Sequence, residues 1–111
     1  MHITIEALKN IFKKASTEKY PIQKKIPEEY RGRLIWIMEK CVGCSLCARV
    51  CPVKAIQITG KGKEAIITYF LDRCIYCAQC VDSCNVKAIE ITREFEFADY
   101  DKSQMKYVYA R

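Results

Sequence analysis

The sequence predicts a small α+β protein built from two similar halves, each with a β-α-β-like order of elements. Three observations lead to this expectation: a repeat at an offset of 33 residues, short β-prone runs on both sides of each copy, and eight cysteines in 111 residues. A chain of this length is expected to form one domain. Its core is small enough to be marginal unless metal or disulfides reinforce it.

The choice between metal and disulfides follows from the rest of the sequence. The first residues contain no apolar signal-peptide core, and the longest apolar run has five residues, 34–38. A membrane span needs about 20. We therefore expect a chain that does not cross a membrane and stays in the reducing cytosol, where structural disulfides are rare. The cysteines are then expected to bind metal.

The N-terminal segment predicts an amphipathic helix of about 13 residues. Its apolar side holds Ile5, Leu8, Ile11, Phe12 and Ala15. Its polar side holds Glu6, Lys9, Asn10 and Lys13. A helix this short is marginal alone in water, so the apolar stripe is expected to pack on something. Three surroundings stay open: the chain's own domain, a partner subunit, and a membrane surface.

The expected organisation has three parts. Residues 1–33 contain the helix and a linker with Pro and Lys, residues 34–94 form the main domain, and residues 95–111 form a C-terminal extension. Strands are predicted at 34–38, 55–59, 65–71 and 88–92, with a turn at 60–63. Short helices are predicted at Cys44–Val50 and Cys77–Ser83. The extension is rich in aromatic residues and is therefore expected to be packed.

The repeat identifies the chemistry. Residues 41–59 and 74–92 align without a gap, and ten of the nineteen pairs are identical. Each copy contains C-x2-C-x2-C-x3-C, the bacterial pattern for a cysteine-ligated iron–sulfur cluster. Two copies are too few for a solenoid. We therefore expect a pseudo-twofold pair around two [4Fe–4S] clusters, which is a ferredoxin-like fold.

In this pattern the fourth cysteine serves the other cluster. Three thiolates at intervals of three can surround one cubane, whereas the fourth lies on the following helical turn and points toward the other site. The predicted ligands of cluster 1 are Cys41, Cys44, Cys47 and Cys84. The predicted ligands of cluster 2 are Cys74, Cys77, Cys80 and Cys51. Because the clusters replace apolar core, the metal-free chain is expected to be largely unfolded.

Other interpretations fit the sequence less well. Structural zinc usually takes two Cys pairs separated by roughly 12–20 residues, whereas here four cysteines fall within eleven residues, twice. A Rieske centre needs two His ligands, and the chain has only His2. We find no Ser–His–Asp set or phosphate-binding Gly loop, so no catalytic residue is predicted. The net charge of +6 falls to about +2 once two clusters of about −2 each are counted, which argues against nucleic acid as a partner.

The residues around the motifs resemble a known family. The segments YP at 20–21, YRGR at 30–33 and FEFADYD at 95–101, together with the paired motifs, are similar to the ferredoxin-like iron–sulfur subunit of respiratory complex I. They are still more similar to the matching subunit of membrane-bound, energy-converting [NiFe] hydrogenases and related sulfur-reductase complexes. Only 22 residues separate the two motifs, which favours this second branch. Asn85 departs from the pattern, since Pro52 stands at its place in the first copy.

The resemblance implies a relay of electrons. They would come from a reduced soluble ferredoxin, pass through the two clusters, and leave to a cluster in the small subunit of a [NiFe]-hydrogenase-like module. The large subunit of that module and the membrane subunits of the complex would be further partners, and the released energy would drive ion pumping. The chain would lie at the cytoplasmic face of the cell membrane as a peripheral subunit. Complex I proper and a free soluble 2[4Fe–4S] ferredoxin shuttle are the alternatives.

Overall fold

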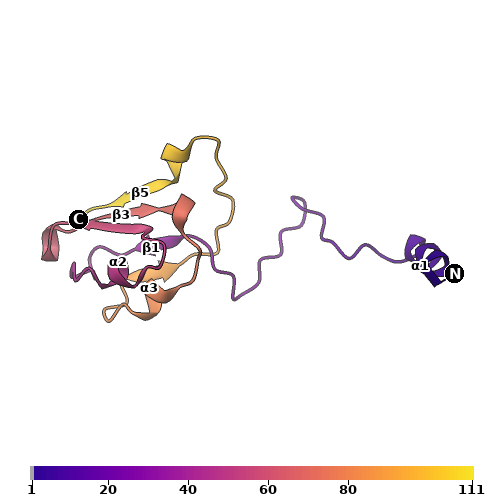
Figure 1. Ribbon diagram of the computed structural model, residues 1–111, viewed down its shortest axis with the longest axis horizontal. Helices are drawn as coiled ribbons and strands as arrows, with labels where there is room; N and C mark the ends of the chain where they lie inside the picture. Colours follow the sequence, from indigo (N-terminus) through magenta and orange to yellow (C-terminus); the bar gives the residue numbers. More distant parts are fainter. Residues whose placement is uncertain (1) are drawn as a thin grey trace.

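The computed structural model describes residues 2–111, whose five strands form two small sheets beside two short helices, with a further helix set apart (Figure 1). The strands are β1 (Leu34–Trp36), β2 (Ile56–Thr59), β3 (Ile66–Phe70), β4 (Ile89–Ile91) and β5 (Lys106–Tyr109). The helices are α1 (His2–Ile11), α2 (Leu46–Val50) and α3 (Gln79–Asp82). Single 3-10 turns cover Gly62–Glu64, Leu71–Arg73 and Lys102–Met105. The fold is therefore of the mixed α+β class.

The strands pair across the two halves. β1, which precedes the first cysteine motif, pairs antiparallel with β4, which follows the second motif. β3, which precedes the second motif, pairs antiparallel with β2, which follows the first. The registers correspond, because Trp36 pairs with Ile89 and, 33 positions later in the repeat, Tyr69 pairs with Ile56. Each half thus lends one strand to the other, which joins the two halves into one unit.

The two motif loops share an unusual local backbone. Residues with positive φ occur in pairs 33 positions apart, namely Gly43 and Tyr76, Ser45 and Ala78, and Lys54 and Lys87. Ser45 and Ala78 directly precede α2 and α3. A left-handed residue cannot belong to a right-handed helix. Both helices therefore begin two residues later than the sequence predicted, at Leu46 and Gln79.

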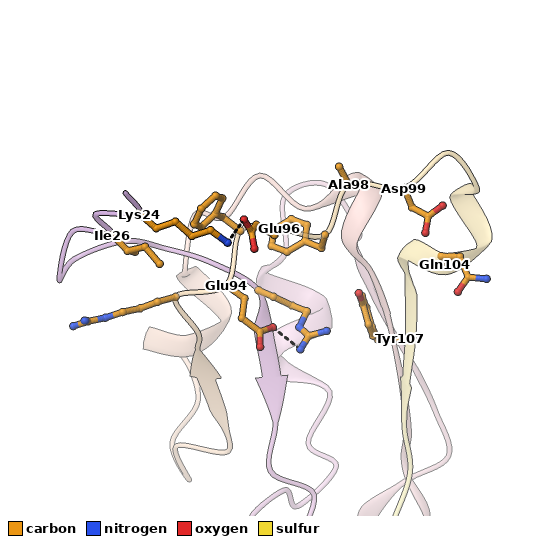
Figure 2. Close-up of a pocket in the computed structure, with 12 residues that line it drawn as sticks. Lys24, Ile26, Glu94, Glu96, Ala98, Asp99, Gln104 and Tyr107 are labelled. Atoms are coloured by element: carbon orange, nitrogen blue, oxygen red, sulfur yellow. Dashed lines mark ion pairs between the residues drawn. The ribbon is translucent and has the colours of Figure 1, made fainter. Parts of the chain in front are cut away.

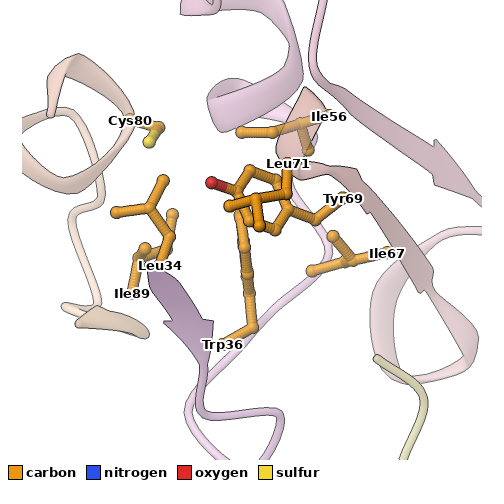
Figure 3. Packing of buried hydrophobic residues seen from close by; sticks show 8 residues of the cluster. All are labelled: Leu34, Trp36, Ile56, Ile67, Tyr69, Leu71, Cys80 and Ile89. Atoms are coloured by element: carbon orange, nitrogen blue, oxygen red, sulfur yellow. The ribbon is translucent and has the colours of Figure 1, made fainter. Parts of the chain in front are cut away.

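The core lies between the paired strands and the two short helices (Figure 3). Its buried side chains are Leu34, Trp36, Ile56, Ile67, Tyr69, Leu71, Cys80 and Ile89. The C-terminal extension contributes to it, because β5 pairs with β3 as the third strand of that sheet. Tyr109 lies 5.3 Å from Trp36 and Tyr107 lies 6.3 Å from Tyr69, measured between ring centroids. Packed aromatic rings therefore anchor the extension to the domain.

The helix α1 lies far from the sheets, at the end of an extended linker (Figure 1). None of its described residues is buried, and Leu8 and Ile11 are 60% and 72% exposed. The apolar stripe predicted from the sequence therefore stays uncovered within residues 2–111. Met1, the first residue of the predicted N-terminal part, lies outside the described residues. In the stretch 2–111, no helix combines the length and the apolar character needed to cross a membrane.

Candidate iron–sulfur centres

The first cavity is bounded by three cysteines of the first motif and the last cysteine of the second. Cys41, Cys44, Cys47 and Cys84 line it together. The rest of the lining is mostly apolar and consists of Trp36, Val42, Gly43, Ser45, Leu46, Ile58, Val86, Ala88 and Ile89. Four thiols thus face one space that has few polar neighbours.

The second cavity has the same construction with the halves exchanged. Its cysteines are Cys74, Cys77, Cys80 and Cys51. Ten of its eleven lining residues lie 33 positions from a residue that lines the first cavity, with Leu34 as the exception. The eight predicted ligands therefore gather in two equivalent groups of four.

Backbone amides position the fourth cysteine of each motif. The Ala55 N–H donates to Cys51 Sγ, with 3.3 Å between nitrogen and sulfur. At the equivalent place the Ala88 N–H donates to Cys84 Sγ, also at 3.3 Å. A donor aimed at sulfur favours the thiolate over the thiol. These amides therefore prepare both cysteines to act as metal ligands.

Burial differs among the cysteines of each cavity. Removal from water raises the pKa of Cys47 to about 11 and the pKa of Cys80 to about 12. Without metal both are neutral thiols at pH 7, and a metal must displace their protons to bind. Cys44 and Cys77, in contrast, are exposed. Each cavity is thus buried on one side and reaches the molecular surface at one cysteine.

The donor set fits an iron–sulfur cluster. Four thiolates are the usual ligands of a [4Fe–4S] cubane, and here four cysteines line each cavity. All eight cysteines are free thiols. Within residues 2–111, no three His, Cys, Asp or Glu side chains lie close enough to hold a single metal ion. The cysteines surround a volume, as a multi-iron group requires.

Two further residues at the cavities are not part of the cysteine motif. Trp36 lines the first cavity and Tyr69 lines the second, and both side chains are buried. Sequence reasoning assigned them only to strands. Each stands five positions before the first cysteine of its motif, Cys41 or Cys74. That shared place in the repeat is the sequence signal that identifies them.

A larger and more open groove lies beside the linker, away from the thiols (Figure 2). No cysteine lines it. Four of its charged groups form two ion pairs: Lys24 Nζ lies 2.5 Å from a Glu96 carboxylate oxygen, and the Arg33 guanidinium lies 2.7 Å from Glu94. The first of these pairs joins the linker to the C-terminal extension. The groove therefore marks where two chain segments meet and is distinct from the cysteine cavities.

Two four-thiol cavities in a repeated α+β fold define a protein that binds two iron–sulfur clusters. The comparison with protein families agrees, because residues 40–88 match the family described as a 4Fe-4S dicluster domain. The chain thus carries two [4Fe–4S] clusters.

The named relatives with similar sequences include subunits of NADH-quinone oxidoreductases. It is 44% identical over 62 residues to NADH-quinone oxidoreductase subunit I of Buchnera aphidicola subsp. Schizaphis graminum, which covers 50% of this chain and 34% of that protein. It is 44% identical over 57 residues to the same subunit of Methylococcus capsulatus, covering 46% and 33%. The chain thus spans about a third of the length of these relatives.

A solved structure matches over more of the chain. A chain of the membrane-bound sulfane sulfur reductase, an archaeal respiratory membrane complex, is similar with a TM-score of 0.61 and 31% identity. The match covers 78% of this chain and 48% of that chain. The protein therefore resembles the iron–sulfur subunits of such complexes, as the segments around its motifs predicted.

Proposed function

We propose that this chain is the electron-relay subunit of a respiratory membrane complex. The ligands of cluster 1 are then Cys41, Cys44, Cys47 and Cys84. The ligands of cluster 2 are Cys74, Cys77, Cys80 and Cys51. The observation that carries this proposal is the pair of equivalent cavities, each lined by three cysteines of one motif and the fourth of the other.

Relay is the activity that this site supports best. A [4Fe–4S] cluster, when bound, accepts and releases one electron. Four cysteines at each cavity leave no iron position for a substrate, so the residues here have no bond-making step to perform. Their task is to hold the group and to keep water from its sulfur atoms, which apolar residues such as Ile56 and Ile89 do. Exclusion of water and hydrogen bonding to sulfur together set a reduction potential.

The exchanged cysteines favour a short path between the two centres. Cys51 directly follows α2, Cys84 follows α3, and these two helices pack against each other. The rings of Trp36 and Tyr69, which line different cavities, have centroids only 5.1 Å apart. In our proposal a pseudo-twofold axis relates the two cavities, and an electron crosses between neighbouring clusters.

The assignment to a complex rests on the matched proteins. The structural match to a chain of the sulfane sulfur reductase covers 78% of this chain. We therefore place the chain beside the small and large subunits of a [NiFe]-hydrogenase-like module that is coupled to ion pumping by membrane subunits. It would lie peripherally, on the cytoplasmic face of the membrane. A subunit of an NADH-quinone oxidoreductase is the closest alternative.

The electron donor in this proposal is a reduced, acidic soluble ferredoxin. Lys61 and Lys63 are exposed and flank Gly62. The Gly62 backbone lies against Gly43 in the first motif loop, where an added Cβ would be only 2.5 Å from the Gly62 carbonyl oxygen. The two lysines therefore mark the cluster 1 side of the molecule. Positive charge there would steer an acidic donor and make cluster 1 the entry point.

The exposed helix α1 gives a test of the complex. We propose that a partner subunit packs on the apolar stripe of α1, because a freely diffusing electron shuttle has no use for a distant amphipathic helix. Size exclusion of a mild detergent extract of native membranes should show this chain at the size of a multi-subunit complex. Deletion of residues 2–11 should release it from that fraction. Elution of the intact chain as a protein of 12.9 kDa would contradict the proposal and favour the shuttle.

A further inference from the structure

Two buried hydrogen-bond donors in the core have no partner. The indole nitrogen Nε1 of Trp36 and the hydroxyl of Tyr69 are both shielded from solvent and make no hydrogen bond within residues 2–111. The side chains are 4% and 0% exposed. Leaving such a donor unpaired destabilises a protein, and buried polar atoms without partners are rare. A partner is therefore expected from a group that binds in this region.

The location of the two donors points to that group. Trp36 lines the first cavity and Tyr69 lines the second, and the two residues occupy the same place in the repeat. Their rings contact each other at 5.1 Å between centroids, with 50° between the ring planes. Figure 3 shows the Tyr69 hydroxyl pointing toward the side on which Cys80 lies. Each half of the chain thus provides one orphan donor beside its own cavity.

Each donor shares its cavity with a set of cysteines. Trp36 lines the first cavity together with Cys41, Cys44, Cys47 and Cys84. Tyr69 lines the second cavity together with Cys74, Cys77, Cys80 and Cys51. The indole N–H can only donate, and a phenol hydroxyl can also donate. The two sets of cysteines are the predicted ligands of different clusters.

We propose that Trp36 and Tyr69 each donate a hydrogen bond to a thiolate of the cluster whose cavity they line, Trp36 at cluster 1 and Tyr69 at cluster 2, and thereby raise the two reduction potentials. The inference rests on the ligand assignment made above. Reduction adds negative charge to the cluster and its thiolates, and a donor to sulfur stabilises that charge. The backbone amides at Cys51 and Cys84 act in the same direction. The two side-chain donors are the part of this shell that a substitution can remove.

Tyr69→Phe is the decisive variant, because it removes one oxygen atom and keeps the ring. Redox titration of the purified holoprotein, followed by EPR, should show one of the two clusters becoming harder to reduce while the other keeps its potential. The typical net contribution of one protein hydrogen bond supports a roughly threefold to tenfold fall in the reduced-to-oxidised ratio at a fixed potential. Tenfold corresponds to about 59 mV for one electron. Trp36→Phe should shift the other cluster in the same direction.

A matched control and a second readout separate hydrogen bonding from packing. Tyr109→Phe changes a ring next to Trp36, but the Tyr109 hydroxyl donates to the Leu34 carbonyl at 3.3 Å and lines neither cavity. It should leave both potentials unchanged. Resonance Raman spectra of wild-type protein should show iron–thiolate modes that shift in D2O, and Tyr69→Phe should weaken this shift.

The outcomes distinguish this inference from the proposed function. Normal iron content in Tyr69→Phe with unchanged potentials and an unchanged D2O shift would overturn the inference and leave the relay standing. Equal shifts of both clusters in Tyr69→Phe would also overturn it, because they would indicate a general packing change. Wild-type protein without [4Fe–4S] clusters would instead refute the proposed function.

Discussion

Paired cysteine substitutions test whether each cluster takes its fourth ligand from the other half of the chain. Cys51 lies on the second cavity with Cys74, whereas Cys41 lies on the first. Cys51→Ala combined with Cys74→Ala therefore removes two thiols from one cavity and leaves the other complete. Cys51→Ala combined with Cys41→Ala removes one thiol from each cavity. The two double variants lose the same number of cysteines and differ only in where they lie.

The magnitude follows from counting complete sets of four thiols. Wild-type protein should contain about two [4Fe–4S] clusters per chain, Cys51→Ala/Cys74→Ala about one, and Cys51→Ala/Cys41→Ala none, since each cluster needs four thiolates. If each motif held its own cluster, the order of the two double variants would be reversed. The comparison therefore decides between two arrangements that the spacing of the cysteines alone allows.

The assay is an EPR spin count of the fully reduced, anaerobically purified protein. EPR also separates [4Fe–4S] clusters from three-iron remnants, which a cavity with three thiols can form. The reciprocal pair provides the control: Cys84→Ala with Cys41→Ala should keep one cluster, and Cys84→Ala with Cys74→Ala should keep none. Equal cluster counts in the two members of a pair, or a higher count in Cys51→Ala/Cys41→Ala, would refute the exchange of ligands.

Three further predictions concern other parts of the chain. Gly43→Ala should lower the free energy of unfolding by about 2 kcal/mol or more, because φ is +66° and the new Cβ would lie 2.5 Å from the Gly62 carbonyl oxygen. Gly62→Ala should lower it less, because φ is +62° but the space around the new Cβ is open. Equal denaturant midpoints for cluster loss in the two variants would contradict this prediction. Lys61→Glu with Lys63→Glu should slow reduction by an acidic ferredoxin at low salt and much less at high salt; stopped-flow rates that do not change at low salt would remove these lysines from the account. Deletion of residues 2–11 should leave the iron content and the circular dichroism of the domain intact, because no residue of α1 is buried. Loss of clusters on deletion would show instead that α1 supports the domain.

The sequence predicted the strands well because their apolar runs are short and sharply bounded. The runs at 34–38, 55–59, 65–71 and 88–92 contain β1 to β4, each shortened by one or two residues at an end. These ends carry the turns into the motif loops, where the chain must change direction. The α+β class followed directly from these runs and the repeat.

The helix starts could not be read from the sequence. The backbone at position 43 is left-handed, which glycine tolerates. The counterpart of Gly43 in the second copy is Tyr76, which has a φ of 54°. Ser45 and Ala78 are also left-handed, although neither residue type indicates this. The loops hold these conformations because the cysteines on either side must all face the same cavity. That requirement comes from the cavity as a whole and leaves no local signal.

The cysteines of the site were predictable, whereas their surroundings were not. The spacing of the eight thiols and the rule for the fourth cysteine give two groups of four, and the structure brings the same groups to the two cavities. Trp36 and Tyr69 looked like ordinary strand residues, because the alternation of buried and exposed residues along a strand does not indicate which buried side chains line a cavity. The pairing of β5 with β3 also depends on tertiary packing, and the aromatic residues of the extension indicated only that it would be packed.

The most direct test of the account is a metal analysis of anaerobically prepared protein. Two [4Fe–4S] clusters predict about eight irons and about eight acid-labile sulfides per chain. Removal of the iron with a chelator should unfold the domain, because the clusters occupy two cavities that apolar side chains do not fill. Stoichiometric zinc without sulfide, or a stably folded chain with no metal, would contradict the central claim.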